Sequence, residues 1–231
     1  MRARHRHFNA RDAGAVFVVD SRYITGLSDG NAVSTWNDRS RNSNNATQAT
    51  ASWQPTYQTA EQGGQPLVKF DGSDDRMATA AVVTTVTDNW TLFSVAKTIS
   101  GSRVHFSNGS DNGYAQTHKG GGSPSVYGGL YGGVQWMAAD SSFTARLDEW
   151  IIMSMRRESG TLRFWGNGII GSISILANPN IPSGFTWLGA DNGGRQNCEI
   201  STAAVINVSI SESLKKRLEH AAAYSFKIAC S

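Results

Sequence analysis

The chain is 231 residues long, which suits one all-β domain, because sandwiches of roughly 200–250 residues are routinely single domains. Only 17% of the residues are charged, while glycine, serine, threonine and asparagine are plentiful; this composition excludes a helical bundle and a disordered chain. The formal net charge of +3 includes four arginines within the first eleven residues, and subtracting them leaves −1, so the body presents no basic face for a nucleic acid.

Residues 1–12 form a basic N-terminal arm, and we take residues 13–231 as one domain. A solvated, frayed terminus is one interpretation of the arm. The other is docking onto a neighbouring subunit, which is either a second copy of the chain or a different protein. The residues that would make this contact are Arg2, Arg4, Arg6 and Arg11.

The sequence contains no segment that predicts membrane insertion. No apolar run approaches the ~18–20 residues of a membrane span, and no apolar signal-peptide region follows the basic arm. We therefore expect no membrane partner and no export through a signal peptide. The protein then stays where it is made, leaves by another route, or leaves the cell inside an assembly.

The first half of the chain predicts strands joined by an irregular flap. Residues 14–21 are rich in β-branched side chains and predict a first strand. Residues 33–77 predict a covering flap that starts at the aromatic anchor Trp36 and ends in a core strand at residues 67–70. Residues 90–97 carry apolar side chains on both faces, as expected of a central strand covered on both sides.

The composition changes after Asn108 and Gly109, which predict a hairpin turn. Residues 109–133 are rich in glycine and carry three tyrosines. A flexible low-complexity segment is one interpretation. Short strands that present exposed rings are another, and such rings serve either as an adaptable contact surface or as cover for a sheet edge.

The last part of the chain predicts further strands and then a helix. Turns at residues 158–160 and 167–168 separate three predicted strands, and two more follow at residues 185–189 and 200–208. After Ser209 or Ser211 as N-cap, apolar residues recur at helical spacing. Two packed antiparallel sheets with a short C-terminal helix account for this pattern. The predicted helical stripe is Leu214, Leu218, Ala221, Ala222 and Phe226.

Four motifs of the flap resemble one known family. They are W-N-D-x-S at residues 36–40, A-T-Q at 46–48, P-x-Y at 55–57 and V-x-F-D-G-x-D-D at 68–75. Together with the predicted central hairpin and terminal helix, they resemble the laminin-G-like, concanavalin A-like lectin and glucanase family of phage and bacterial proteins. The resemblance implies a jelly-roll β-sandwich.

Glucanases share this fold, but the sequence lacks their catalytic patterns. The E-x-D-x-E strings of those glucanases do not occur, and the adjacent Asp148 and Glu149 would point to opposite faces of a strand. No nucleophile elbow and no histidine or cysteine metal motif occurs. We therefore expect no enzyme activity and no cofactor. Calcium stays open, because some laminin-G-like domains bind it through loop aspartates such as Asp74 and Asp75.

Two cysteines, Cys198 and Cys230, are too few for a disulfide framework. We expect two reduced, half-buried thiols. A metal site would need further ligands that the sequence does not place beside them.

The favoured function is a non-enzymatic, lectin-like virion surface protein, such as a phage decoration, fibre or neck component. It would contribute to assembly, to attachment to a host glycan, or to both. Its partners would be other virion subunits or copies of itself, bound through the arm, and a cell-surface glycan. A free carbohydrate-binding module and a glycoside hydrolase are the alternatives. The candidate glycan-binding residues are Trp53, Tyr57, Tyr131 and Trp136 as stacking platforms, with Asp111, Asn112 and His118 as polar partners.

Overall fold

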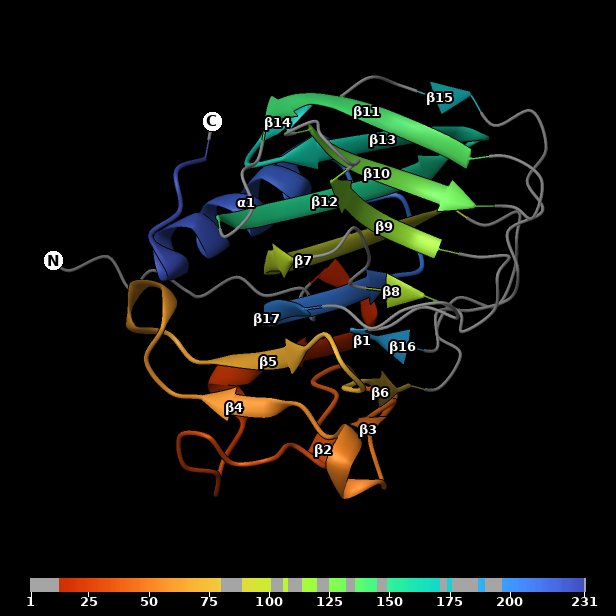
Figure 1. Ribbon diagram of the computed structural model, residues 1–231. Helices are drawn as coiled ribbons and strands as arrows, with labels where there is room; N and C mark the ends of the chain where they lie inside the picture. Colours follow the sequence, from red (N-terminus) through yellow and green to blue (C-terminus); the bar gives the residue numbers. More distant parts are fainter. Residues whose placement is uncertain are drawn as a thin grey trace, which may run out of the picture.

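The computed structural model describes most of the domain. The described residues are 13–79, 89–100, 106–107, 114–119, 125–131, 136–144, 149–170, 174–175, 187–189 and 197–230. Two antiparallel sheets form a β-sandwich, and one C-terminal helix lies against it (Figure 1). This architecture confirms the predicted all-β class with its terminal helix. Within the described residues, no helix is long and apolar enough to cross a membrane.

The first sheet is built around the longest strands of the chain. Its strands are β1 (Ala15–Asp20), β4 (Thr56–Gln58), β5 (Leu67–Asp71), β7 (Trp90–Ser100), β12 (Trp150–Glu158), β13 (Thr161–Gly166), β14 (Ile169–Ile170), β15 (Ser174–Ile175) and β17 (Asn197–Ile206). The order is β14-β13-β12-β7-β17-β5-β4, with β15 on β13 and with β1 on the same edge of β17 as β5. The antiparallel run β12-β13-β14 confirms the strands predicted on either side of the turns at residues 158–160 and 167–168.

The second sheet is made of shorter strands. They are β2 (Thr35–Trp36), β3 (Ala46–Thr47), β6 (Met77–Ala78), β8 (Phe106–Ser107), β9 (Tyr114–Lys119), β10 (Ser125–Tyr131), β11 (Trp136–Thr144) and β16 (Trp187–Leu188). Their order is β11-β10-β9-β8-β16-β6-β3-β2, so β11 and β2 lie at opposite edges (Figure 1). Strands β9 and β10 show that the glycine-rich segment contains ladder-forming backbone. The turn predicted at Asn108 and Gly109 lies outside the described residues.

Strand β7 is covered on both faces, as its sequence predicts. It lies between β12 and β17, and Leu92 and Phe93, on opposite faces, are 3% and 4% exposed. Leu92 belongs to the cluster between the sheets, together with Trp36 and Phe70. Phe93 belongs to a second cluster that packs against the helix.

Helix α1 (Glu212–Phe226) begins at Ser211, whose side chain accepts a hydrogen bond from the backbone N–H of Leu214. The predicted apolar residues Leu218, Ala222 and Phe226 are buried. The same face also buries two charged residues that the sequence reasoning did not predict, Lys215 and Glu219.

These two charges form an ion pair within the helix, on the face that packs against the sheet. Lys215 Nζ lies 2.8 Å from Glu219 Oε2, and their side chains are 2% and 1% exposed. Ser154 on β12 donates a 2.8 Å hydrogen bond to the other oxygen of Glu219. Lys215 Nζ also lies 4.5 Å from the ring centroid of Trp165 on β13. The contacts with Ser154 and Trp165 therefore attach this pair, and with it the helix, to the sheet.

The flap confirms its predicted role as a cover. Trp36 is 1% exposed within the core, and backbone hydrogen bonds pin the chain at Val33 to Pro55 and at Tyr57 to Asn31, each 2.8 Å long. The flap also covers the outer edge of β1, which pairs only with β17 among the described strands.

Asp38 organises this edge. One of its carboxylate oxygens accepts hydrogen bonds from the backbone N–H groups of Val18 and Ser40, and the other accepts from Asn44, each at 2.8 Å. Arg39 N–H in turn donates to the carbonyl of Val18 at 2.6 Å. The W-N-D-x-S motif therefore supplies the partners that a neighbouring strand would otherwise give to an open sheet edge.

The two thiols occupy different environments and are not bonded. Cys198 lies fully buried between the sheets, so the expectation of a half-buried thiol is wrong for it, because its strand position faces the core. Cys230 is partly buried beside the helix. Burial raises the pKa of both thiols, which keeps them protonated.

Replacement of Glu219 by Gln is expected to destabilise the protein by about 3 kcal/mol, because it removes the buried carboxylate beside the Lys215 ammonium and leaves the half-exposed Glu212, 3.9 Å away, as its partner. Urea unfolding followed by tryptophan fluorescence measures the change. The double variant Lys215→Met/Glu219→Leu is the matched control, and it should recover most of the loss. An equally large loss in the double variant would show that the charge pair is not the cause.

Candidate functional site

The predicted glycan-binding residues lie in separate parts of the molecule. His118, Tyr131 and Trp136 lie on the adjacent strands β9, β10 and β11. Trp53 and Tyr57 lie in the flap. The remaining predicted residues lie outside the described part of the chain; they are Asp111 and Asn112, and Arg2, Arg4, Arg6 and Arg11 of the arm.

The ladder register brings the first group to one face of the second sheet. Tyr131 pairs with Trp136 across β10 and β11, while Tyr127 pairs with His118 on one side and Asp140 on the other. Positions two apart along a strand share a face, so both tyrosine positions belong to the same face. We call the positions His118, Tyr127, Tyr131, Trp136 and Asp140 the aromatic face.

The opposite face of these strands has a different composition. It carries more aliphatic residues, as expected where a sheet packs on a core: Ala115, Val126, Leu130, Met137 and Ala139, with Thr117, Lys119 and Gly128. Antiparallel sheets commonly turn an apolar face inward and a polar one to solvent. The sequence of these strands shows the same kind of alternation between their two faces.

The sequence reasoning missed two members of the aromatic face. Tyr127 was noticed as a tyrosine in a glycine-rich segment but not as a binding residue. Asp140 belongs to no local motif, and only its pairing with Tyr127 places it there. Tyr127 and Tyr131 are four residues apart, which is a multiple of the two-residue alternation of a strand. This spacing is the signal that would have linked Tyr127 to Tyr131.

The flap aromatics are placed differently. Tyr57 is 7% exposed and belongs to the core between the sheets, so little of its ring is available to a ligand. Trp53 is partly buried, and the guanidinium of Arg76 lies 4.0 Å from its ring centroid. Neither residue belongs to the aromatic face.

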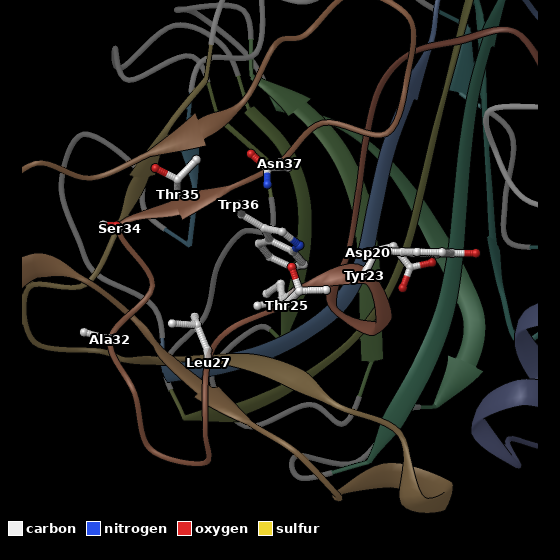
Figure 2. A pocket seen from close by; sticks show the side chains of 10 residues that line it. Asp20, Tyr23, Thr25, Leu27, Ala32, Ser34, Thr35, Trp36 and Asn37 are labelled. Atoms are coloured by element: carbon white, nitrogen blue, oxygen red, sulfur yellow. The ribbon is translucent and has the colours of Figure 1, made fainter.

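A cleft of about 120 Å³ opens beside the 3-10 turn η2 (Ser21–Tyr23) that follows β1. Its floor is the buried Trp36, and its rim includes the exposed Thr25, Ser34, Thr35 and Asn37. Figure 2 shows the indole ring between Thr25 and Asn37, with its nitrogen on the side of Tyr23 and Asp20. Ile24 and Leu27 add apolar wall. We call this hollow the Trp36 cleft.

The electrostatics of the Trp36 cleft are close to neutral. Asp20, a lining carboxylate, is paired with Arg22, whose Nη2 lies 2.6 Å and whose Nε lies 2.9 Å from its oxygens. The indole Nε1 of Trp36, by contrast, has no hydrogen-bond partner among the residues that the structure describes. A buried donor without a partner costs about 1–3 kcal/mol.

The structure also brings together the two predicted calcium candidates. A carboxylate oxygen from each of Asp71, Asp74 and Asp75 lies within 4.8 Å of the others. Asp71 accepts backbone hydrogen bonds from Ser73 and Asp74, and Asp75 accepts one from the N–H of Asp71. These bonds explain the acids as parts of a tight turn.

The exposed Asp71 and the buried Asp75 have pKa values shifted in opposite directions. Burial, with the nearby charges of Asp71 and Asp74, raises the pKa of Asp75 to about 6. Against the effect of burial, backbone hydrogen bonds from Ser73 and Asp74 lower the pKa of Asp71. The turn therefore stabilises one ionised carboxylate and disfavours ionisation of the other.

Stability should fall as the pH rises through about 6, because the folded protein holds the Asp75 proton more tightly than the unfolded chain, whose value is 3.8. Replacement of Asp75 by Asn removes this ionisation, because an amide does not titrate in this pH range. Asp75→Asn should be about 1–3 kcal/mol more stable than the parent above pH ~7 and equally stable below pH ~4. Urea midpoints of both proteins across this range test the prediction. Parallel curves would show that Asp75 does not titrate as described.

No protein-family model and no curated protein sequence matches this chain. Solved structures do resemble it. Domain 4 of AbnA, a GH43 extracellular arabinanase from Geobacillus stearothermophilus, in complex with arabinotriose, matches with a TM-score of 0.62 and 10% identity over 84% of this chain and 100% of that one. The botulinum neurotoxin serotype D binding domain matches with a TM-score of 0.63 and 8% identity over 91% of this chain and 51% of that one.

A Trypanosoma rangeli sialidase in complex with 2,3-difluoro-KDN also matches, with a TM-score of 0.56 and 13% identity over 92% of this chain. The present chain spans 33% of that sialidase and about half of the neurotoxin chain. At these identities the matches show the fold, a β-sandwich that also occurs as a complete domain of an arabinanase.

Proposed function

We propose that the protein is a non-enzymatic carbohydrate-binding β-sandwich, and that it binds glycan on the aromatic face. The ladder register of β9, β10 and β11 carries this proposal, because it assembles Tyr127, Tyr131 and Trp136 with two polar residues. The similar domain of the arabinanase was solved with arabinotriose, and the similar sialidase with a sugar derivative, which supports the choice of ligand class.

The spacing of the aromatic face suits a sugar chain. Tyr127 and Tyr131 are four residues apart on β10, which corresponds to about 13 Å along an extended strand. The row between them carries Gly129 and its partner Ala138, so the smallest residues separate the aromatic positions. Tyrosine and tryptophan supply rigid contact area with a polar group at one end, and few degrees of freedom are lost when they bind.

The absence of catalysis is part of the proposal. Most glycosidases need two carboxyl groups, about 5–5.5 Å or about 6.5–9.5 Å apart, on either side of the bond that they cleave, although sialidases use a tyrosine nucleophile. Asp140 is the one carboxylate of the aromatic face as defined above. The acidic turn of Asp71, Asp74 and Asp75 belongs to β5 and the loop that follows it, in the other sheet.

Trp136→Ala and Tyr131→Ala should each weaken the binding of arabinotriose or a related oligosaccharide at least tenfold, which is about 1.4 kcal/mol. Isothermal titration calorimetry against arabino-, xylo- and sialyl-oligosaccharides measures the affinities. Trp53→Ala, which removes an aromatic outside the face, is the matched control and should bind as the parent does.

Each titration should be repeated with calcium and with a chelator, and the mixtures assayed for reducing ends. Unchanged affinity and no released sugar would support a site that needs no cofactor and performs no hydrolysis. Equal losses in the Trp53 and Trp136 variants, or no binding to any oligosaccharide, would contradict the proposed face.

We further propose that the protein acts on a virion surface, as a decoration, fibre or neck component. The basic arm supports this role, since four positive charges on a body of net charge −1 suit docking onto another subunit or a second copy. A glycan-binding face would then serve host attachment. No nucleic acid or membrane is proposed as a partner.

Light scattering of the full chain and of a variant lacking residues 1–12 tests the arm. We expect the full chain to form a closed oligomer and the truncated chain to be monomeric. Two monomers would show that the arm does not mediate self-association. Two oligomers of equal mass would place the contact elsewhere on the domain.

A further inference from the structure

We propose that the Trp36 cleft is a second ligand site, which takes a single neutral sugar ring. The existence of the site rests on the cleft and the polar groups of its rim, whereas the choice of a sugar rests on the proposed carbohydrate binding. It lies beside β2, at the edge of the second sheet opposite to β11, so it is separate from the aromatic face (Figure 1).

The floor of the cleft is the first argument. Trp36 is 1% exposed, and its Nε1–H finds no acceptor among the described residues. The nitrogen is enclosed, with less than 1 Å² of accessible surface, so a ligand in the cleft would settle over the indole without bonding to it. The N–H therefore serves as a local reporter of an occupied cleft.

The chemistry of the rim selects the kind of ligand. Thr25, Ser34 and Thr35 offer hydroxyls and Asn37 an amide, and each of these groups both donates and accepts hydrogen bonds. A polyhydroxylated ring has the same dual character. The apolar wall residues Ile24 and Leu27 match the C–H faces of such a ring.

The charge and size of the cleft narrow the choice. Asp20 is engaged by Arg22 and the other lining side chains are uncharged, so the lining itself leaves no unpaired charge. Outside the lining, the guanidinium of Arg39 lies 4.3 Å from the ring centroid of Tyr23. The cleft's volume of about 120 Å³ holds several waters, at about 10–15 Å³ each. That volume is well below the ~300 Å³ of a typical drug-sized site, which points to one ring and not to a chain.

The indole N–H gives a direct readout. The protein has seven tryptophans, so its proton–nitrogen correlation spectrum should show that many indole signals, and the Trp36 signal is the one lost in Trp36→Phe. If this variant does not fold, Phe variants of the other six tryptophans identify the signal by elimination. The probes are L-arabinose, D-xylose and D-galactose, with N-acetylneuraminic acid as the anionic comparison.

We expect at least one neutral sugar to shift the Trp36 signal saturably, with millimolar affinity, and the anionic sugar to leave it unchanged. Thr25→Val, which removes a rim hydroxyl at constant shape, should weaken this binding about tenfold. Thr25→Ser should retain it. A Trp36 signal that no sugar moves, or that moves equally in the Val variant, would overturn the assignment.

Trp136→Ala separates this inference from the proposed function. If that variant loses oligosaccharide binding while Trp36 never responds to sugars, the aromatic face stands and the second site is wrong. If it leaves both the Trp36 response and oligosaccharide binding intact, the cleft stands and the aromatic face is wrong. Loss of the Trp36 response in Trp136→Ala would show that the two are not separate sites, and would overturn the inference.

Discussion

The edge of β1 is the constraint on which the flap depends. A strand with unpaired backbone groups on one side invites pairing with other chains, and here the loop around Asp38 and Arg39 closes it. Asp38 binds the N–H of Val18 and at the same time orders its own loop through Ser40 and Asn44. Because Trp36 and Asn37 immediately precede Asp38, the same hydrogen bonds fix the floor and one side of the Trp36 cleft.

The first sheet is buried on two sides, and each side uses different chemistry. Between the sheets the contacts are mainly apolar, and Phe70 and Phe164 are members of this core cluster. Under helix α1 an ion pair takes part, with Lys215 and Glu219 enclosed between Ser154 and Trp165. Both charges belong to the helix, so the polar contacts that join it to the sheet here are the hydrogen bond from Ser154 to Glu219 and the approach of Lys215 to the Trp165 ring. A shift of the helix along the sheet would break both.

The two proposed ligand sites use opposite edges of the second sheet. At one edge, three adjacent strands give a regular array of positions on one face. At the other, short strands and a long flap create a small, irregular hollow. A regular ladder suits an extended ligand, and a hollow suits a single ring. Both are supported by the same first sheet, whose long strands supply most of the core.

The sequence by itself determined the class of fold and its main elements. Alternation and turn residues are local signals, so they located β7 and the hairpin of β12 and β13, and they narrowed the helix N-cap to Ser209 or Ser211. The structure shows that the cap is Ser211. The aromatic pattern likewise identified Tyr131 and Trp136 as candidates. The predictions of strands, turns and helix succeeded because each depends on neighbours only a few residues away. The glycan-binding role of Tyr131 and Trp136 stays a prediction.

Only the tertiary structure decided which of these residues meet. The pairing of Tyr127 with Asp140, the burial of Tyr57 and the enclosure of Lys215 depend on strand register and sheet packing, which join residues far apart in the chain. The unpaired Trp36 nitrogen is a matter of three-dimensional surroundings as well. A motif predicts the local backbone, but the partners of a side chain are set by the elements that fold against it.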